Sequence, residues 1–172
     1  MRLGAVCLAI YALCPSAPGI ASELPTPHAI TLSQPRVSPA ANGDVVIALQ
    51  AHGDLRGLVT LTLHADGDTI AGEWSLVSAY FQDVDENGNP IDPEPTEEDK
   101  PHLERITYVN NGTLGGTIDG GHVIVNADGD VAGIEGLRLT IVSSTLAFEG
   151  ASGGGSLESP ALTDGGSLSL TF

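Results

Sequence analysis

The sequence predicts an all-β protein, with an antiparallel eight-stranded closed barrel as the first choice of architecture. Apolar and polar residues alternate with period two along most of the chain, which is typical of strands with one buried and one wet face. Glycine-rich turn sequences separate these runs, and no run follows the helical period of 3.6 residues. Without helices to cover a sheet, the sheet must close on itself or pack on a second sheet. A two-sheet sandwich is therefore the alternative.

The alternating runs predict the individual strands. They occupy residues 45–49, 59–63, 70–80, 123–125, 137–141, 146–148 and 168–172. Two Asp-Gly pairs, at 66–67 and 128–129, predict tight hairpin turns because this dipeptide accepts positive φ angles. The many turns indicate a single domain of about eight or nine short strands.

The first residues predict an exported protein. Residues 1–21 combine one basic residue, an apolar run and small residues before a cleavage position near Ala21, as in a secretory signal peptide. The apolar run is too short for a membrane anchor. We therefore expect a secreted or periplasmic protein with no stable membrane insertion after signal cleavage. Residues 22–43 are expected to form an extended lead-in, followed by a barrel domain at 44–172.

Both cysteines, Cys7 and Cys14, lie within the predicted signal peptide. The exported part is therefore expected to contain neither a disulfide nor a thiolate site. Export without disulfides suggests a bacterial origin. The terminal alternation at 168–172 resembles an outer-membrane barrel, but such barrels need strands of about ten residues and aromatic girdles. With few aromatic residues and glycine-broken strands, a soluble barrel is the expectation.

The charge of the chain is strongly negative. There are 22 acidic residues against 6 lysines and arginines, for a formal net charge of −16. Such a surface repels nucleic acids and anionic lipids. We therefore expect no nucleic-acid partner, whereas cations and basic partners are favoured.

The acidic residues are concentrated in a predicted loop insert at 82–103. Its sequence fits the spacing of a calcium-binding loop, in which alternate oxygen-bearing residues face one ion and a glycine permits the turn. The candidate calcium ligands are Asp83, Asp85, Asn87, Asn89 and Glu94. The flanks do not predict the two helices of an EF-hand, so an Asn-Gly turn in a solvated loop is the alternative. Calcium is a possible cofactor, and no cofactor is required.

A second set of candidates is apolar and is expected to line the barrel interior. These residues are Trp74, Leu76, Tyr80, Tyr108, Leu139 and Phe148. An eight-stranded barrel is just wide enough to hold one small ligand or to be filled by side chains. The sequence therefore predicts either a binding site for a small apolar ligand or a packed core.

No catalytic residue is predicted. The chain has no Gly-x-Ser-x-Gly nucleophile motif. The spacing of His52 with Asp54, and of His64 with Asp66, would place each pair on one strand face. Both pairs lie at predicted hairpin ends, where aspartate is a common turn residue, so a structural role is favoured.

The segment 139–157 resembles part of the allene oxide cyclase and dirigent-like β-barrels. The shared features are a Phe148-Glu-Gly sequence followed by a glycine-rich turn, while residues 143–146 depart from the family's glycine-rich entry. The resemblance implies an eight-stranded barrel whose interior holds an apolar molecule. It implies no catalytic residue at any position of this chain.

Three functions follow as expectations. The first is a barrel that binds a small apolar ligand. The second is a structural or surface interaction protein with a cation-binding acidic loop. The third, an enzyme of the cyclase or isomerase type, needs a polar group inside the barrel, for which only Tyr80 and Tyr108 are candidates.

Overall fold

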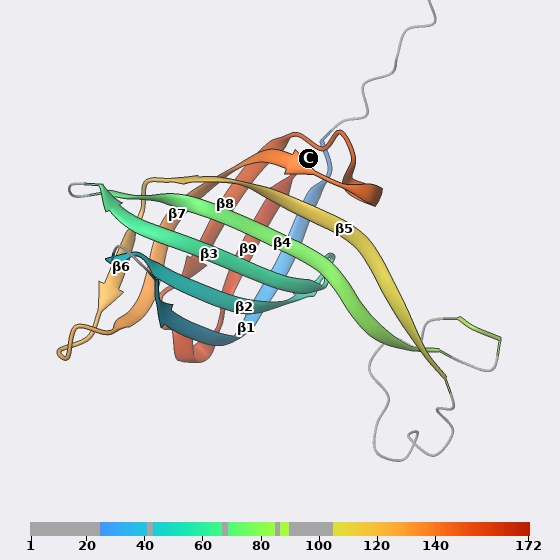
Figure 1. Ribbon diagram of the computed structural model, residues 1–172, viewed down its shortest axis with the longest axis horizontal. Helices are drawn as coiled ribbons and strands as arrows, with labels where there is room; N and C mark the ends of the chain where they lie inside the picture. The colour runs from blue at the N-terminus through green and yellow to red at the C-terminus, as the bar shows by residue number, and fades with distance from the viewer. Residues whose placement is uncertain (1–24, 41–42, 67–68, 85–86, 90–104) are drawn as a thin grey trace, which may run out of the picture.

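The computed structural model of the chain describes residues 25–40, 43–66, 69–84, 87–89 and 105–172. These residues form a closed eight-stranded antiparallel barrel with one additional strand, as the sequence predicts (Figure 1). The strands are β1 (Pro27–Pro39), β2 (Val45–Gly53), β3 (Gly57–Asp66), β4 (Thr69–Val84), β5 (Arg105–Asp119), β6 (His122–Val125), β7 (Val131–Ser144), β8 (Gly153–Ser159) and β9 (Gly166–Thr171).

The barrel closes because β5 pairs with β7. The strand order is β5-β4-β3-β2-β1-β9-β8-β7, and the β5–β7 ladder joins the two ends of this series. All pairings among the described strands are antiparallel. A continuous hydrogen-bonded wall replaces the two separate sheets of a sandwich, so the alternative architecture is excluded.

The core lies inside this wall. Alternate apolar residues on each strand point inward, as in Val59, Leu61 and Leu63 of β3, which are at most 2% exposed. The inward side chains form one continuous hydrophobic cluster with contributions from all eight barrel strands. Burial of this apolar surface is the main favourable term in folding the barrel.

The first strand corrects the predicted domain boundary. The sequence predicts a lead-in at residues 22–43, whereas residues 27–39 of this range form β1, which pairs with both β2 and β9. The alternation of apolar residues in β1 is short because the β1–β2 ladder shifts register between Ser33 and Arg36. Gln34, within this shift, has a positive φ of 49°. A β-bulge of this kind hides the strand period from the sequence.

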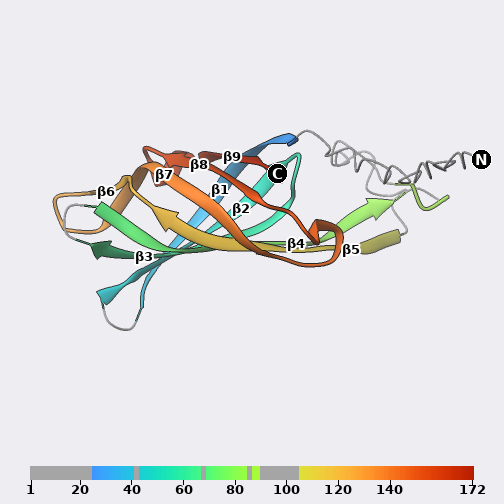
Figure 2. The same ribbon diagram turned by 90° about the horizontal axis from the view of Figure 1, so that it is seen from above.

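Strand β6 continues β5 along β7. Asp119 pairs with Arg138, and His122, three residues further along the chain, pairs with Glu135, three residues earlier on β7. The ladder thus resumes in the same register after Gly120 and the glycine that follows it, both of which have positive φ angles. The additional strand and the start of β7 form a hairpin at the end of the barrel near the β6 label (Figure 2).

At the opposite end, β4 and β5 extend beyond the barrel as a two-stranded ribbon (Figures 1 and 2). The ladder of β4 with β3 ends at Val77, and the ladder of β5 with β7 begins at Leu114. Beyond those points β4 and β5 remain paired with each other as far as Val84 and Arg105. We call residues 79–84 and 105–110 the arm.

Two further elements differ from the sequence predictions. Residues Leu146–Phe148 form a short 3-10 helix, η3, where a strand was expected. Strands β4 and β7 are longer than predicted, with 16 and 14 residues, and β5, with 15 residues, lies where no alternating run predicts a strand. Glycine and asparagine interrupt the apolar alternation in β5, so this strand cannot be recognised from the period alone.

Among the described residues, no helix has the length and apolar character needed to cross a membrane.

Candidate functional site

Four of the six predicted interior residues lie in the barrel core. Trp74, Leu76, Leu139 and Phe148 are between 0% and 8% exposed and belong to the continuous hydrophobic cluster. They contact the side chains of other strands, so the interior near them is occupied by the protein itself. A ligand at this position would have to displace packed side chains.

The two tyrosines lie in the arm, and one of them faces outward. Tyr80 is half-buried and shares the strand face of Trp74 and Leu76. Tyr108 is 56% exposed, which corrects the prediction that it lines the interior. The cause is a bulge at Asn111, which reverses the inward and outward phases of β5.

The bulge is held by polar contacts at the barrel end. The Asn111 side-chain amide donates a hydrogen bond of 3.2 Å to the Ser78 hydroxyl, which is fully buried. The Asn110 side-chain oxygen accepts a hydrogen bond of 3.0 Å from the backbone N–H of Gly112. The second of these bonds gives a partner to a backbone N–H beside the bulge, and the first joins the side chains of the two strands.

The predicted calcium ligands fall mainly outside the described residues. Asp85 and Glu94 are outside them, and Asn87 and Asn89 lie in a short exposed turn. Asp83 is a residue of β4, opposite Ile106 of β5. In the described part of the chain, no three His, Cys, Asp or Glu residues are grouped as for a metal ion. Calcium binding stays a prediction.

The His52-x-Asp54 pair anchors a turn. The Asp54 carboxylate accepts a hydrogen bond of 2.7 Å from the backbone N–H of Ala29, which ties the end of β2 to β1. The His52 Nε2 atom lies 3.0 Å from the Ser33 hydroxyl across the same two strands. The Asp54 carboxylate therefore binds a backbone N–H group, which is the structural role expected of an aspartate in a turn.

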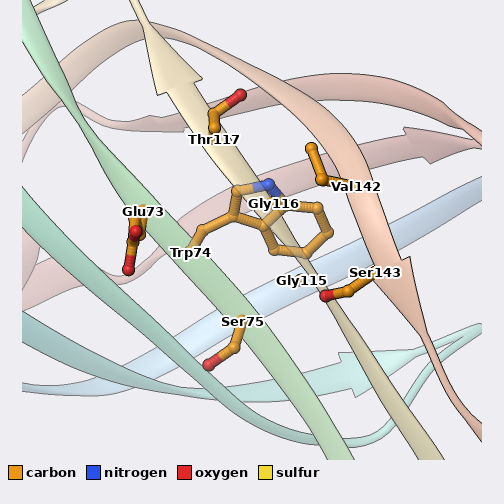
Figure 3. Close-up of a pocket in the computed structure, with 8 residues that line it drawn as sticks. All are labelled: Glu73, Trp74, Ser75, Gly115, Gly116, Thr117, Val142 and Ser143. Carbon is orange, nitrogen blue, oxygen red and sulfur yellow. The ribbon is translucent and has the colours of Figure 1, made fainter.

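A surface depression of about 310 Å³ lies where β4, β5 and β7 meet (Figure 3). Two consecutive glycines of β5, Gly115 and Gly116, form its floor, because neither carries a side chain there. Inside the wall, the Trp74 indole packs across Gly116, and its Nε1 donates a hydrogen bond of 3.2 Å to the Thr140 carbonyl. The indole thus bridges β4 to β7 beneath β5.

The rim of the depression is polar on most sides. Glu73, Ser75 and Thr117 stand on the outer faces of β4 and β5, and Ser143 and Val142 stand on β7 (Figure 3). Val142 is 69% exposed because it continues the outer face of β7, in phase with Arg138 and Thr140. Within the described residues, the Glu73 carboxylate makes no hydrogen bond or ion pair. The depression therefore offers one carboxylate, three hydroxyls and an apolar edge.

The same outer wall continues into an apolar stripe toward the arm. We define the apolar stripe as Leu58, Val77, Phe81 and Tyr108, which are 41%, 41%, 74% and 56% exposed. Leu58 is opposite Val77, and Phe81 is opposite Tyr108 with ring centroids 5.3 Å apart. Val77 and Phe81 share the outer face of β4 with Glu73 and Ser75 of the depression.

Sequence reasoning identified neither the depression nor the apolar stripe. The two glycines and the residues around them come from three strands, whose register no local pattern gives. In the sequence, the residues of the apolar stripe appear only as part of an alternation of side chains, and such an alternation does not show which strand face points into the barrel. The available indication in the sequence was the position of Phe81, a large aromatic residue beside an acidic segment.

Comparisons with known proteins give no relative for this chain: no family model, no curated protein and no solved structure matches it.

Proposed function

We propose that this protein is an acidic interaction protein that binds a basic polypeptide partner through the outer wall of its barrel. The observation that carries this proposal is the exposed aromatic pair of the arm, Phe81 and Tyr108. Aromatic residues are enriched among the side chains that anchor protein interfaces. The antiparallel ladder of β4 and β5 holds both rings in fixed positions.

The packed interior supports an outer contact surface more than an internal ligand. The inward side chains form one cluster, whereas the arm presents its two rings to solvent. The small-ligand and cyclase expectations both require space or a polar group within the barrel. The resemblance of segment 139–157 to allene oxide cyclase-like barrels supports those expectations only through the shared barrel architecture.

The negative charge of the chain indicates which class of partner it binds. The chain carries a net charge of −16, so a second copy of it is repelled at long range and a basic partner is attracted. The sequence between the two strands of the arm, residues 85–104, contains eight acidic residues against Lys100. Arginine and lysine side chains also interact favourably with aromatic faces. A basic polypeptide thus complements both the charge and the rings.

The proposal is tested by capturing partners from an extract of the source organism. The bait is the wild-type protein, a Phe81→Ala plus Tyr108→Ala double variant, or Val37→Ala. Val37 is a matched control, because it is an apolar residue of β1 that is 44% exposed. We expect the wild type and the control to retain the same basic protein, and the double variant to lose it. Elution should occur at raised salt concentration, which screens the charge attraction.

Retention of that protein by the double variant would contradict the proposal. The absence of any basic protein whose capture depends on the two rings would contradict it equally. An eluted protein is then purified and its binding measured directly against all three baits.

A further inference from the structure

We infer that the depression over Gly115 and Gly116 is a subsite for an arginine side chain of the basic partner. This inference rests on the proposed function and adds a second contact, separate from the aromatic pair. The two features share one outer wall, because Glu73 and Phe81 are both exposed and lie an even number of residues apart on β4. The eight-residue separation corresponds to about 26 Å along the strand. One partner surface can therefore contact both.

The shape of the depression follows from the missing side chains of β5. Its volume of about 310 Å³ is at the lower end for a ligand site, which suits one side chain rather than a whole molecule. A Cβ atom at Gly115 would lie 2.9 Å from the Ser143 hydroxyl and would occupy part of the space. The glycine therefore keeps the depression open.

The chemistry of the rim fits a guanidinium group. Glu73 supplies a negative charge that has no ion-pair partner within the described part of the chain. Ser75, Thr117 and Ser143 supply hydroxyl acceptors around it, and Val142 offers an apolar edge to the aliphatic stem. Arginine presents several N–H donors in one plane and can bond a carboxylate with two of them, which lysine cannot.

The inference is tested on the purified protein with a defined probe, N-acetyl-arginine amide, by following backbone amide signals in an NMR titration. We expect saturable binding at millimolar concentrations, with the largest changes at residues 115–117 and 142–143. The matched variants are Glu73→Gln, which removes the charge but keeps the shape, and Glu158→Gln. Glu158 is an exposed carboxylate of β8, on another part of the barrel wall.

Glu73→Gln should weaken the binding about fivefold, while Glu158→Gln should leave it unchanged. Gly115→Ala should also weaken the binding, because the methyl group fills the depression without altering any charge. The dispersion of the amide spectrum shows whether each variant remains folded. If either Glu73→Gln or Gly115→Ala fails to fold, the other variant still tests whether the depression binds arginine.

Several results would overturn the inference. They are no binding by the wild type, equal binding by the wild type and Glu73→Gln, or signal changes confined to other parts of the molecule. Equally tight binding of N-acetyl-lysine amide would overturn the preference for a guanidinium group. None of these results affects partner capture by Phe81 and Tyr108, so the subsite can fail while the proposed function stands. If capture of a basic protein did not depend on Phe81 and Tyr108, the proposed function itself would be contradicted.

Discussion

Leu76 and Phe81 lie five residues apart on the same strand and have opposite surroundings. Leu76 is completely buried in the barrel, whereas Phe81 is 74% exposed on the arm. Both are large and apolar, and both lie in a continuous antiparallel ladder. The odd spacing places them on opposite faces of β4, and only the inner face is covered by the opposite wall. Apolar character thus indicates burial only where the sheet closes around the residue.

The strongest test of this contrast is Leu76→Ala. Removing a fully buried leucine side chain should lower the free energy of unfolding by about 2–5 kcal/mol, because a cavity remains among packed neighbours. Denaturation by urea, followed by circular dichroism, measures the change. A loss below about 1 kcal/mol would mean that the barrel interior is not tightly packed at this position.

The next test separates two adjacent glycines. A Cβ atom at Gly116 would collide with the Thr140 carbonyl oxygen, which belongs to the neighbouring strand. One at Gly115 would crowd only the rotatable Ser143 hydroxyl, with the Trp74 carbonyl oxygen at an ordinary contact distance of 3.4 Å. We therefore expect Gly116→Ala to destabilise the fold by about 1–3 kcal/mol, since the backbone must shift. Gly115→Ala is the matched control and should cost clearly less. Equal free energies of unfolding for the two variants in the same urea experiment would show that the backbone of the β5–β7 ladder shifts at little cost.

A smaller effect is expected from the indole hydrogen bond that crosses this seam. Replacement of Trp74 with 3-benzothienylalanine keeps the shape of the ring system but removes the N–H group that bonds the Thr140 carbonyl. The expected loss is about 1 kcal/mol, the usual net value of such a bond. Thermal unfolding of the two proteins measures it. An unchanged midpoint would show that the bond adds nothing beyond ring packing.

The smallest effect on stability is expected at the arm. The coupling between Phe81 and Tyr108, measured by a double-mutant cycle of alanine variants, should be about 0.2–1 kcal/mol, the range of cross-strand pairs. The pair is exposed, so its removal should hardly alter the barrel. A coupling above about 2 kcal/mol would indicate a structural role for the rings and would weaken the proposal that they bind a partner.

The closed barrel was predictable because its interior follows simple alternation. Leu61, Leu139 and Leu168 lie in runs whose period is unbroken, and each is at most 3% exposed. The absence of helical periodicity left few ways to cover the sheet. The two-residue period of apolar side chains and the composition were thus enough to predict the barrel architecture and to place Trp74 and Leu76 in its core.

The errors of prediction arise where the ladder is irregular. The shift after Ser33 concealed β1, and the bulge at Asn111 turned Tyr108 outward. One extra residue reverses every later side chain of a strand, and no local composition announces it. The depression depends on the register of Gly115 with Ser143 across the seam. Such long-range pairings are set by the complete fold and cannot be obtained from a single stretch of sequence.

The seam between β1 and β9 has a consequence for the order of folding. Pro27 pairs with Thr171, so nearly the whole described chain lies between the two partners. Until β9 is available, β1 and β8 each lack a neighbour, and their unpaired edges can recruit other chains. Contacts of this sequence separation place all-β proteins among the slower folders, in the range of about milliseconds to seconds. Strand β9, the last of the described strands in sequence, therefore supplies the missing neighbour of both β1 and β8.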